Sequence, residues 1–393
     1  MRPKADWPIT QLGKLAEFRN GVNYTKNSFG EGIKVIGVSD FQDYIKPRYQ
    51  ELEQINPEGV VTDRNILRDG DILFVRSNGN RELIGRSLYI ENPPARITHS
   101  AFTIRLRFTK DGIYPQFYAY LFRAPVMRKA MTAYGGGTNI CNLNQDILAS
   151  LEVLVPPSRI QKRIVNILSN YDDLIEDSQR RIQILESMAR ALYREWFVHF
   201  RFPGHEATPL GTSPAGNVPK GWEVGRLDDI LVLQRGFDLP KNDRSEGTVP
   251  IYAATGVNGF HSEAKVKAPG VVTGRSGTIG TVLYVQDDFW PLNTTLWVKD
   301  FPKSEPLYAY YVLSELDLKQ FNSGAAVPTL NRNDIHGLDA LIPPRWLQQR
   351  FQEVGGAMLA EARILQLQIE NLRRTRDLLL PRLLSGQIDL SQT

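Results

Sequence analysis

The chain has 393 residues, of which 42% are hydrophobic and 23% charged, and its formal net charge is +4. These values are ordinary for globular protein, and the length predicts two or three domains. No apolar run approaches the roughly 20 residues of a membrane-spanning helix, and no secretory signal is visible after Met1. The single cysteine, Cys141, excludes an internal disulfide and fits a reducing compartment. We therefore expect a cytoplasmic protein without a membrane partner.

Charge is distributed unevenly along the chain. Residues 1–157 hold 20 Lys and Arg against 16 Asp and Glu, whereas residues 204–342 hold 12 against 16. The balance thus changes from +4 in the first region to −4 in the second. Net charge alone is therefore a poor argument for nucleic-acid binding, and any surface that faces DNA has to be a local patch.

The first region is built of short β-branched runs separated by turn residues. Residues 70–77 and 84–90 are strand-like and bounded by Gly and Asn, a pattern typical of strands and turns. An aromatic stretch at 115–131 has helical character. The order predicts a compact, mostly β module with some helix over residues 1–155.

After Pro156 and Pro157 the apolar residues change to a helical period. Steps of four and three residues connect the positions from Ile164 to Trp196, with Ser178 as the polar member. This is the seam of a coiled coil, and it predicts a long helix over residues 156–203. An apolar stripe of that length has to pack against a partner helix or another protein.

Residues 204–221 are rich in Pro, Gly, Ser and Thr, which predicts an extended linker. Residues 222–342 then repeat the earlier order, with strand-like runs at 270–276 and 279–285 and an aromatic helical stretch at 306–321. This region predicts a second module of the same kind as the first.

A second heptad seam follows Pro343 and Pro344 and predicts a second long helix within residues 343–393. Gly355 and Arg376 are its weak points, and Pro381 is expected to end or kink the helix. Each helix covers roughly 40 residues, or about 60 Å. An antiparallel pair is the simplest way to bury both seams.

The two halves are also copies of each other at their most regular segment. Residues 143–164 and 330–351 share Leu-Asn, Pro-Pro and Gln at a constant offset, since 343 − 156 and 348 − 161 both equal 187. A long-period repeat indicates repeated modules. The predicted fold is two α/β (α+β) recognition modules in tandem repeat, joined by two long antiparallel coiled-coil helices with pseudo-twofold symmetry.

Catalytic and metal motifs are weak. Asn92-Pro-Pro-Ala95 is similar to a methyltransferase loop, but Ala95 cannot stack on a flipped base, which favours a turn. Glu263-Ala-Lys265 with Asp243 upstream partly fits a nuclease metal site, yet the usual Pro-Asp is missing. Metal-ligand spacing is likewise missing among the histidines, which are His99, His199, His205, His261 and His336.

Two features of the sequence each fit two interpretations. The Gly-rich segment 274–280 is not a P-loop, and it fits either a tight turn alone or a turn that also contacts DNA phosphate. Charged residues on the helices, such as Arg180-Arg181 and Arg373-Arg374, fit either solvated faces or contact with a partner.

Taken together, the motifs resemble the DNA-specificity (S) subunit of a type I restriction–modification system. The matching segments cover essentially the whole chain, in order and twice over: Gly221-Trp222, the Leu143-Asn144…Pro156-Pro157…Gln161 segment with its copy, Leu192-Tyr-Arg-Glu-Trp-Phe-Val198, and Leu380-Pro-Arg-Leu-Leu-Ser-Gly-Gln-Ile388. The net acidic second module and Gly355-Gly356 within the second helix are departures.

The resemblance implies a non-catalytic subunit of a DNA adenine methyltransferase and restriction endonuclease complex. Two target-recognition domains, 1–155 and 222–342, would each bind one half of a split site in double-stranded DNA. The helices would set the spacing and dock two methyltransferase (M) subunits, and restriction (R) subunits would join that core. S-adenosylmethionine, ATP and Mg²⁺ would belong to those partners, with no cofactor or metal on this chain.

Base recognition would fall to polar loop residues, with Arg and Lys holding phosphates. Candidates in the first module are Arg19, Asn20, Asn23, Tyr24, Lys26, Arg76, Asn78, Asn80, Arg81, Thr138 and Asn139. Candidates in the second module are Arg235, Lys241, Arg244, Asn258, His261, Arg275, Thr278, Asn293, Thr294, Thr329 and Arg332. Several of the asparagines also fit a purely structural role in turns.

Two other classes of protein compete with this hypothesis. A free-standing DNA methyltransferase or nuclease would transfer methyl groups or cleave DNA without partners. A coiled-coil scaffold with no nucleic-acid role would show no sequence-dependent DNA binding, even beside methyltransferase subunits.

Overall fold

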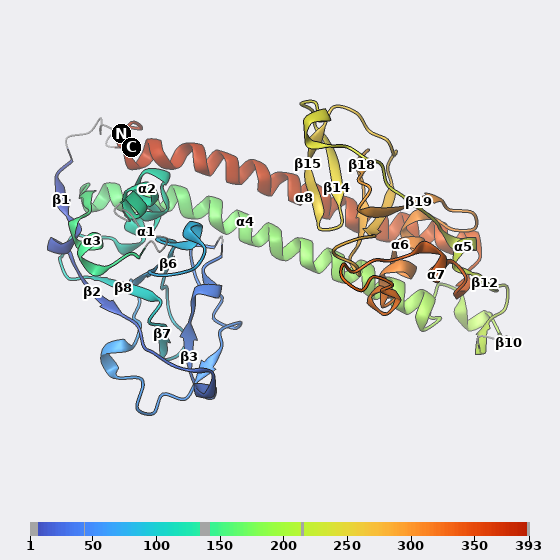
Figure 1. Cartoon of the computed structure of the whole chain (residues 1–393), viewed down its shortest axis with the longest axis horizontal. Coiled ribbons are helices and arrows are strands. Elements are labelled where there is room, and N and C mark those ends of the chain that lie inside the picture. The colour runs from blue at the N-terminus through green and yellow to red at the C-terminus, as the bar shows by residue number, and fades with distance from the viewer. Residues whose placement is uncertain (1–6, 43, 134–141, 214–215, 391–393) are drawn as a thin grey trace. The chain divides into compact units, whose positions relative to one another are not determined.

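The computed structural model describes residues 7–42, 44–133, 142–213 and 216–390. It divides into two compact units. Unit 1 comprises Met1–Ile175 and Asn371–Thr393, and unit 2 comprises Glu176–Glu370. Two long helices, α4 (Ser158–Tyr193) and α8 (Arg345–Leu384), contribute one part of their length to each unit (Figure 1).

Unit 1 is built on a four-stranded antiparallel sheet in the order β2-β8-β5-β6. Its strands are β2 (Ala16–Asn20), β8 (Thr103–Phe108), β5 (Ile72–Val75) and β6 (Ser87–Tyr89). The apolar run Ile-Leu-Phe-Val of β5 is buried on both faces. The predicted strand-like runs at 70–77 and 84–90 therefore form the centre and one edge of this sheet.

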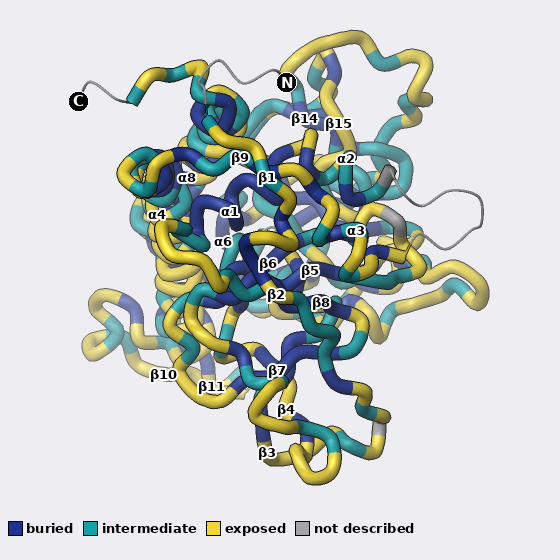
Figure 2. The backbone as a smooth tube through the Cα atoms, turned by 90° about the vertical axis from the view of Figure 1, so that its left-hand side faces the viewer, coloured by how far each residue is buried: buried dark blue, intermediate teal, exposed yellow. Residues whose placement is uncertain are grey.

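A smaller sheet in the order β4-β3-β7 completes the β part of unit 1, and a further strand pair closes the module. The bounds are β3 (Phe29–Ile36), β4 (Gln54–Ile55), β7 (Ile97–His99), β1 (Ile9–Gln11) and β9 (Glu152–Leu154). The first half of β3 is exposed, whereas β5 and β6 are buried (Figure 2).

Three short helices cover unit 1. They are α1 (Pro115–Arg123), α2 (Pro125–Ala133) and α3 (Gln145–Ser150). Pro115 starts α1, where a missing N–H costs nothing. Asn144 of the repeated Leu-Asn caps α3, because its Oδ1 accepts the Ile147 N–H at 2.8 Å.

Unit 2 repeats this architecture strand for strand. Its larger sheet has the order β13-β19-β16-β17, its smaller sheet β15-β14-β18, and β12 pairs with β20. The strands are β12 (Glu223–Arg226), β13 (Val232–Arg235), β14 (Val249–Ala253), β15 (Gly256–His261), β16 (Gly270–Gly274), β17 (Val282–Val285), β18 (Trp290–Pro291), β19 (Thr295–Asp300) and β20 (Asp339–Ile342). The helices are α5 (Leu227–Ile230), α6 (Pro306–Glu315) and α7 (Arg332–His336).

The repeat extends to single hydrogen bonds at the start of each long helix. In unit 1 the buried Gln161 accepts the Tyr114 N–H at 2.8 Å and donates to the Pro156 carbonyl at 2.7 Å. In unit 2 the buried Gln348 accepts the Glu305 N–H at 2.9 Å and donates to the Pro343 carbonyl at 2.8 Å. The repeated glutamine thus ties each long helix to the start of α1 or α6.

The long helices pair antiparallel within each unit. In unit 1, Asp172 of α4 forms an ion pair with Arg376 of α8. In unit 2, Arg181 pairs with Glu361, and Tyr193 near the end of α4 packs against Phe351 near the start of α8. The predicted fold class of two α+β modules in tandem repeat with paired long helices is confirmed.

The predicted seams are confirmed, since every seam residue of α4 and α8 is buried or half-buried. Of the two outcomes expected at Pro381, an end of the helix is not observed, because the helix continues to Leu384. The segment expected to be an extended linker also contains two paired strands, β10 (Leu210–Ser213) with β11 (Gly216–Pro219).

Gly355 interrupts the second seam for a local reason. An added Cβ at this position would lie 3.0 Å from Leu307 Cδ2, so the absent side chain lets α6 approach α8.

Within the described ranges, no helix combines the length and the apolar composition needed to cross a membrane.

Candidate nucleic-acid interface

The same edge of the larger sheet carries the candidate residues in each unit. In unit 1 the edge is formed where β2 and β5 end and β8 begins, because neighbouring antiparallel strands place these ends together. In unit 2 the matching edge is formed by β13, β16 and β19. We call residues 20–22, 76–78 and 100–102 the loop frame of unit 1, and residues 235–237, 275–277 and 292–294 the loop frame of unit 2.

A glycine in each loop frame permits close backbone approach. A Cβ on Gly21 would lie 2.2 Å from the His99 carbonyl oxygen, and one on Gly236 would lie 2.2 Å from that of Leu292. The next residue donates its N–H in both units, from Val22 to His99 and from Phe237 to Pro291, each at 2.8 Å. Only glycine fits this crossing, which explains why the segments Arg19-Asn20-Gly21 and Arg235-Gly236 both contain a glycine at this position.

The repeated arginines occupy equivalent backbone positions. Arg76 donates its N–H to the Phe102 carbonyl at 2.8 Å, and Arg275 donates to Thr294 at 2.8 Å. Each arginine carbonyl accepts the N–H of the repeated leucine, from Leu143 at 2.9 Å and from Leu330 at 2.8 Å. The repeated Leu-Asn therefore anchors the following segment to the loop frame.

The structure brings several unit 2 candidates together at the loop frame. Arg275 Nε donates to the Asn293 carbonyl at 2.8 Å, and the Asn293 amide donates to Asp238. The exposed Arg235 lies 3.7 Å from the same carboxylate. These contacts hold two arginines beside one asparagine while leaving Arg235 accessible.

Three other unit 2 candidates lie around this group. A β-bridge joins Ser276 to Thr329, and Thr278 is exposed in the turn that follows. Arg332 is exposed but donates to the Leu233 carbonyl at 3.2 Å. Segment 274–280 forms a turn after β16. Gly277 within it has a φ of 92°, a conformation that favours glycine.

A separate group of candidates lies at the β14–β15 hairpin. Arg244 Nη1 donates to the Asn258 carbonyl at 2.6 Å, and Lys241 is exposed on the neighbouring turn. His261 is buried, accepts the Ser245 N–H at 3.0 Å, and packs edge-on against Trp290 at 5.1 Å. These contacts hold the His261 ring in the interior of unit 2, and its predicted role in DNA binding stays a prediction.

The first-module candidates divide into frame residues and turn residues. Arg19 and Asn20 are half-buried at the end of β2, and Asn20 accepts a hydrogen bond from Gln145 at 3.1 Å. Asn78 and Asn80 accept backbone N–H groups two residues ahead, at 2.8 and 3.0 Å. These two asparagines therefore form Asx turns after β5, as the alternative interpretation proposed.

The remaining first-module candidates surround the same edge. Asn23 is exposed. Tyr24 packs edge-on against Phe29 at 5.5 Å, and burial followed by the charges of Glu53 and Asp40 raises its pKa. Thr138 and Asn139 lie outside the described residues, as do the side chains of Lys26 and Arg81.

One exposed frame residue was missed by the sequence. Phe102 is 61% exposed and occupies the position in unit 1 that Thr294 occupies in unit 2. Thr294 was a candidate and Phe102 was not, because the segments share little sequence apart from the threonine that follows, Thr103 or Thr295. Matching the two backbones is the signal that finds it.

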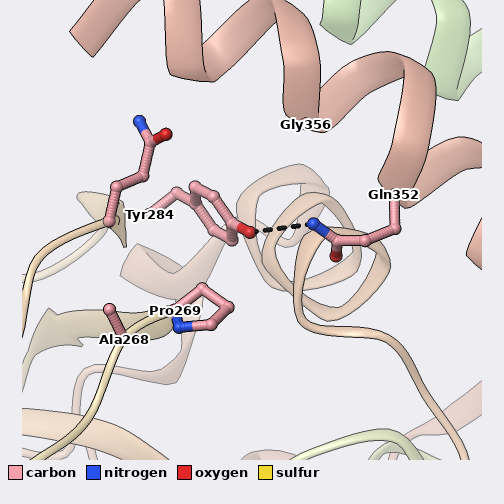
Figure 3. Close-up of a pocket in the computed structure, with 6 residues that line it drawn as sticks. Ala268, Pro269, Tyr284, Gln352 and Gly356 are labelled. Carbon is pink, nitrogen blue, oxygen red and sulfur yellow. Dashed lines mark hydrogen bonds between the residues drawn. The ribbon is translucent and has the colours of Figure 1, made fainter.

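A cavity of about 370 Å³ lies in unit 2 beside α8 and is shown in Figure 3. Its lining residues are Ala268, Pro269, Tyr284, Gln286, Gln352 and Gly356. Gln352 is committed to structural bonds, since it accepts the Leu307 N–H at 2.9 Å and donates to Tyr284 Oη at 3.1 Å. Among the described residues, no group of three or more His, Cys, Asp or Glu could hold a metal ion.

Asn92 and Lys265, from the two weak catalytic motifs, have structural contacts. Asn92 has a φ of 44° and donates its N–H to Asp69 at 2.7 Å, as expected for a turn. The Lys265 ammonium lies 4.8 Å above the Trp290 ring, where it forms a cation–π contact.

Comparison with known proteins matches this duplicated architecture. The family model of the type I restriction modification DNA specificity domain matches residues 4–187 and 219–352. The chain is 26% identical to the type I restriction enzyme MjaIX specificity subunit of Methanocaldococcus jannaschii, across 98% of this chain and 94% of that protein. It is 21% identical to the HindI specificity subunit of Haemophilus influenzae, across 83% and 88%.

A solved structure has the same fold. The crystal structure of a type I restriction–modification S subunit from M. genitalium aligns with a TM-score of 0.63 and 16% identity, covering 98% of this chain and 99% of that chain. Two α+β units that each have a loop frame of the same backbone structure but different side chains define a two-module recognition protein. The family model covers most of the chain, and the chain therefore belongs to the type I restriction–modification DNA specificity family. It is the non-catalytic recognition component of such a system.

Proposed function

We propose that each module recognises one half of a bipartite DNA site. The observation that carries this proposal is the duplicated loop frame, in which the backbone hydrogen bonds match between units while the exposed side chains differ. A shared backbone with unlike side chains is what two readers of unlike sequences need. Side-chain contacts with base edges give specificity, whereas phosphate contacts give position.

The recognition domains are residues 1–155 and 222–342 in this proposal. Arg76, Arg235 and Arg275 contact DNA from the loop frames, Arg19 contacts it from the end of β2, and the other candidates named from the sequence surround them. His261 acts indirectly, by holding the β14–β15 hairpin through Ser245. Replacing an arginine that binds guanine is expected to weaken recognition of one base pair. Replacing an arginine that binds phosphate is expected to weaken binding to all sequences equally.

The segments 156–203 and 343–393 act as spacers, and residues 204–221 connect the first spacer to the second module. A continuous helix transmits an insertion as a rise of about 1.5 Å per residue. Two linked modules bind with high affinity only when their spacing matches the spacing of the half-sites. The spacer helices therefore determine the number of base pairs between the two half-sites.

The same helices dock two methyltransferase subunits in this proposal. In unit 2, Ile184 and Met188 of α4 are 50% and 48% exposed, and Ile364 and Leu367 of α8 are 50% and 46% exposed. In unit 1, Leu378 is 66% exposed. Exposed apolar residues that gather on one surface are a feature of protein interaction sites. S-adenosylmethionine, ATP and Mg²⁺ are used by the methyltransferase and restriction subunits.

The test begins with sequencing of methylated bases in DNA from cells that express the chain with its methyltransferase subunit. We expect one split motif. Exchange of residues 1–155 for those of another family member should change one half-site only, and exchange of residues 222–342 should change the other. A single undivided motif, or a change in both halves after one exchange, contradicts the proposal.

The spacer role has a separate test. Four residues inserted near Gln179 move one module by about 6 Å, so the gap in the methylated motif should lengthen or methylation should stop. An unchanged motif argues against the spacer. Methyl transfer or cleavage by the isolated chain would support the alternative of a free-standing enzyme.

A further inference from the structure

The side chain of Phe102 is the feature of the unit 1 loop frame that the proposed function leaves unexplained. It lies in the turn between β7 and β8 and is 61% exposed. A large exposed aromatic side chain leaves apolar surface in water, and burying that surface against a partner is favourable. A single exposed phenylalanine is by itself unremarkable, so its setting has to carry the argument.

The backbone around Phe102 is fixed. Its carbonyl accepts the Arg76 N–H at 2.8 Å, and the preceding Ala101 donates to Val22 at 2.8 Å. Thr103 donates both its N–H and its hydroxyl to the Ser100 carbonyl, at 2.9 and 2.8 Å. The aromatic ring therefore projects from a rigid turn, and contact with a partner would require little ordering of the backbone.

The surroundings of Phe102 are cationic and polar. Arg76 is hydrogen-bonded to it through the backbone, and Arg19 and Asn20 lie at the end of the adjacent strand β2. Asn23 is exposed on the loop that continues from β2. An aromatic side chain among arginines and asparagines fits a nucleic acid, in which apolar base faces lie beside phosphates.

Unit 2 carries a different group at the same backbone position. Thr294 accepts the Arg275 N–H at 2.8 Å, as Phe102 accepts that of Arg76. Its hydroxyl oxygen is buried and, among the described residues, has no hydrogen-bond partner. The loop frame therefore does not require an aromatic residue at this position. Phe102 is specific to module 1 and is not a requirement of the repeated fold.

We propose that Phe102 makes an apolar contact with a base of the half-site that module 1 recognises. This inference rests on the proposed function, and it assigns a specificity-determining role to a residue outside the polar candidates. Phenylalanine contacts DNA either at the thymine 5-methyl group or as a wedge between base pairs. Both are the same kind of contact between an apolar ring and a base.

The experiment measures DNA binding by the full chain assembled with its methyltransferase subunits, on duplexes that carry the motif found by methylation sequencing. Phe102→Ala should weaken binding to the cognate duplex about tenfold, the loss expected for one base contact. It should leave binding to a duplex scrambled in both half-sites unchanged. Phe102→Leu keeps an apolar side chain and should retain part of the affinity.

A matched control is Phe260→Ala, because Phe260 is 57% exposed on β15 of unit 2. It should leave discrimination at the first half-site intact. Replacing each thymine of that half-site by uracil, and each adenine by fluorescent 2-aminopurine, then locates the contact. A wild-type thymine-methyl or unstacking signal that disappears in Phe102→Ala supports the contact.

The proposed function and the role of Phe102 are contradicted by different results. If the wild-type assembly does not distinguish cognate from scrambled DNA, the proposed function is wrong. If the wild type does distinguish them but Phe102→Ala has the same affinity and methylates the same motif, the inference about Phe102 is wrong. Circular dichroism of Phe102→Ala shows whether the variant is folded, so that a loss of binding can be distinguished from a loss of folding.

Discussion

The two units have the same strand order but join their module to the long helices with different chemistry. In unit 2 the junction is aromatic: Tyr193 of α4 stacks on Tyr311 of α6 at 5.0 Å and lies 6.1 Å from Phe351 of α8. In unit 1 apolar residues of α4 and α8 also pack on the module, but the junction includes a polar contact: Tyr120 of α1 donates to Asp172 of α4 at 2.6 Å, and Asp172 pairs with Arg376 of α8. A repeated fold therefore does not require a repeated interior.

The difference changes what each junction contributes. Apolar rings stabilise mainly through the area that they bury. An ion pair that is partly withdrawn from water adds little net stability but penalises any register in which one charge loses its partner. We infer that the polar junction sets the helix register in unit 1, and that the aromatic junction supplies stability in unit 2.

The largest effect is expected for Tyr193→Ala. The side chain is buried within a cluster of rings, and truncating a buried aromatic costs about 3–5 kcal/mol. Urea unfolding followed by tryptophan fluorescence reports on unit 2, because Trp196 and Trp222 lie in the same core. Tyr193→Phe keeps the ring and is the control, with an expected loss below about 1 kcal/mol. A loss below about 1 kcal/mol for Tyr193→Ala would argue against an aromatic junction.

The next effect is that of Asp172→Ala in unit 1. It removes the partner of both Tyr120 and Arg376, and burial with the Asp172 charge raises the pKa of Tyr120. Because the side chains of Asp172 and Arg376 are 19% and 22% exposed, the expected loss is about 1–3 kcal/mol, less than for a fully buried pair.

A double replacement separates stability from register. Asp172→Leu with Arg376→Met should recover most of the lost stability, since well-packed apolar pairs replace buried ion pairs at little cost. If the pair sets register, the double variant should show altered crosslinking between cysteines placed on α4 and α8 of unit 1. Unchanged crosslinking would mean that the seam alone fixes the register.

These junctions also define what the sequence could predict. The seams of α4 and α8 follow from a local period, and the repeated Gln161 and Gln348 mark a contact close to each helix start. Arg376 was visible only as an interruption of the seam, because Tyr120 and Asp172 meet it through tertiary contacts far apart in the chain. The loop frame was partly visible through Arg76 and Arg275.

The limits were sharpest where backbone, and not sequence, is repeated. Phe102 and Thr294 accept equivalent hydrogen bonds, but the side chains at this position are unrelated because backbone atoms, and not these side chains, form the bonds of the loop frame. His261 shows a second limit of the sequence. Its burial could not be predicted, because the Ser245 N–H and the Trp290 ring reach it through tertiary contacts.

Acid should affect unit 1 more strongly than unit 2. Burial, followed by the charges of Arg105 and Arg107, lowers the pKa of His99 to about 3. The unfolded chain binds a proton at this histidine near pH 6.5, whereas the folded unit does not. The contribution of His99 is therefore complete above about pH 6.5 and is lost as the pH falls toward 3, by about 2 kcal/mol at pH 5.

The position in unit 2 that corresponds to His99 is Pro291, which does not titrate. Partial burial lowers the pKa of His336, which lies elsewhere in unit 2. Unit 2 should therefore lose less stability than unit 1 on acidification. Hydrogen exchange resolved by peptide at pH 7 and pH 5, corrected for intrinsic rates, measures both units in one sample. His99→Gln should remove most of the difference, provided that it folds at pH 7. Equal losses in the two units would show that His99 does not govern the acid response.

The smallest effect is expected where unit 2 also has an ion pair. Arg181 and Glu361 lie 3.1 Å apart, with side chains 60% and 45% exposed, so water screens their attraction. Arg181→Ala should change the unfolding free energy by less than about 0.5 kcal/mol, in contrast to Asp172→Ala. The same variant tests the alternative interpretations of Arg180-Arg181. If these arginines form a solvated face, co-purification with the methyltransferase subunit is unchanged. If they contact a partner, Arg181→Ala weakens that assembly while stability remains intact, and Glu353→Ala, an exposed residue on α8, is the control that should affect neither.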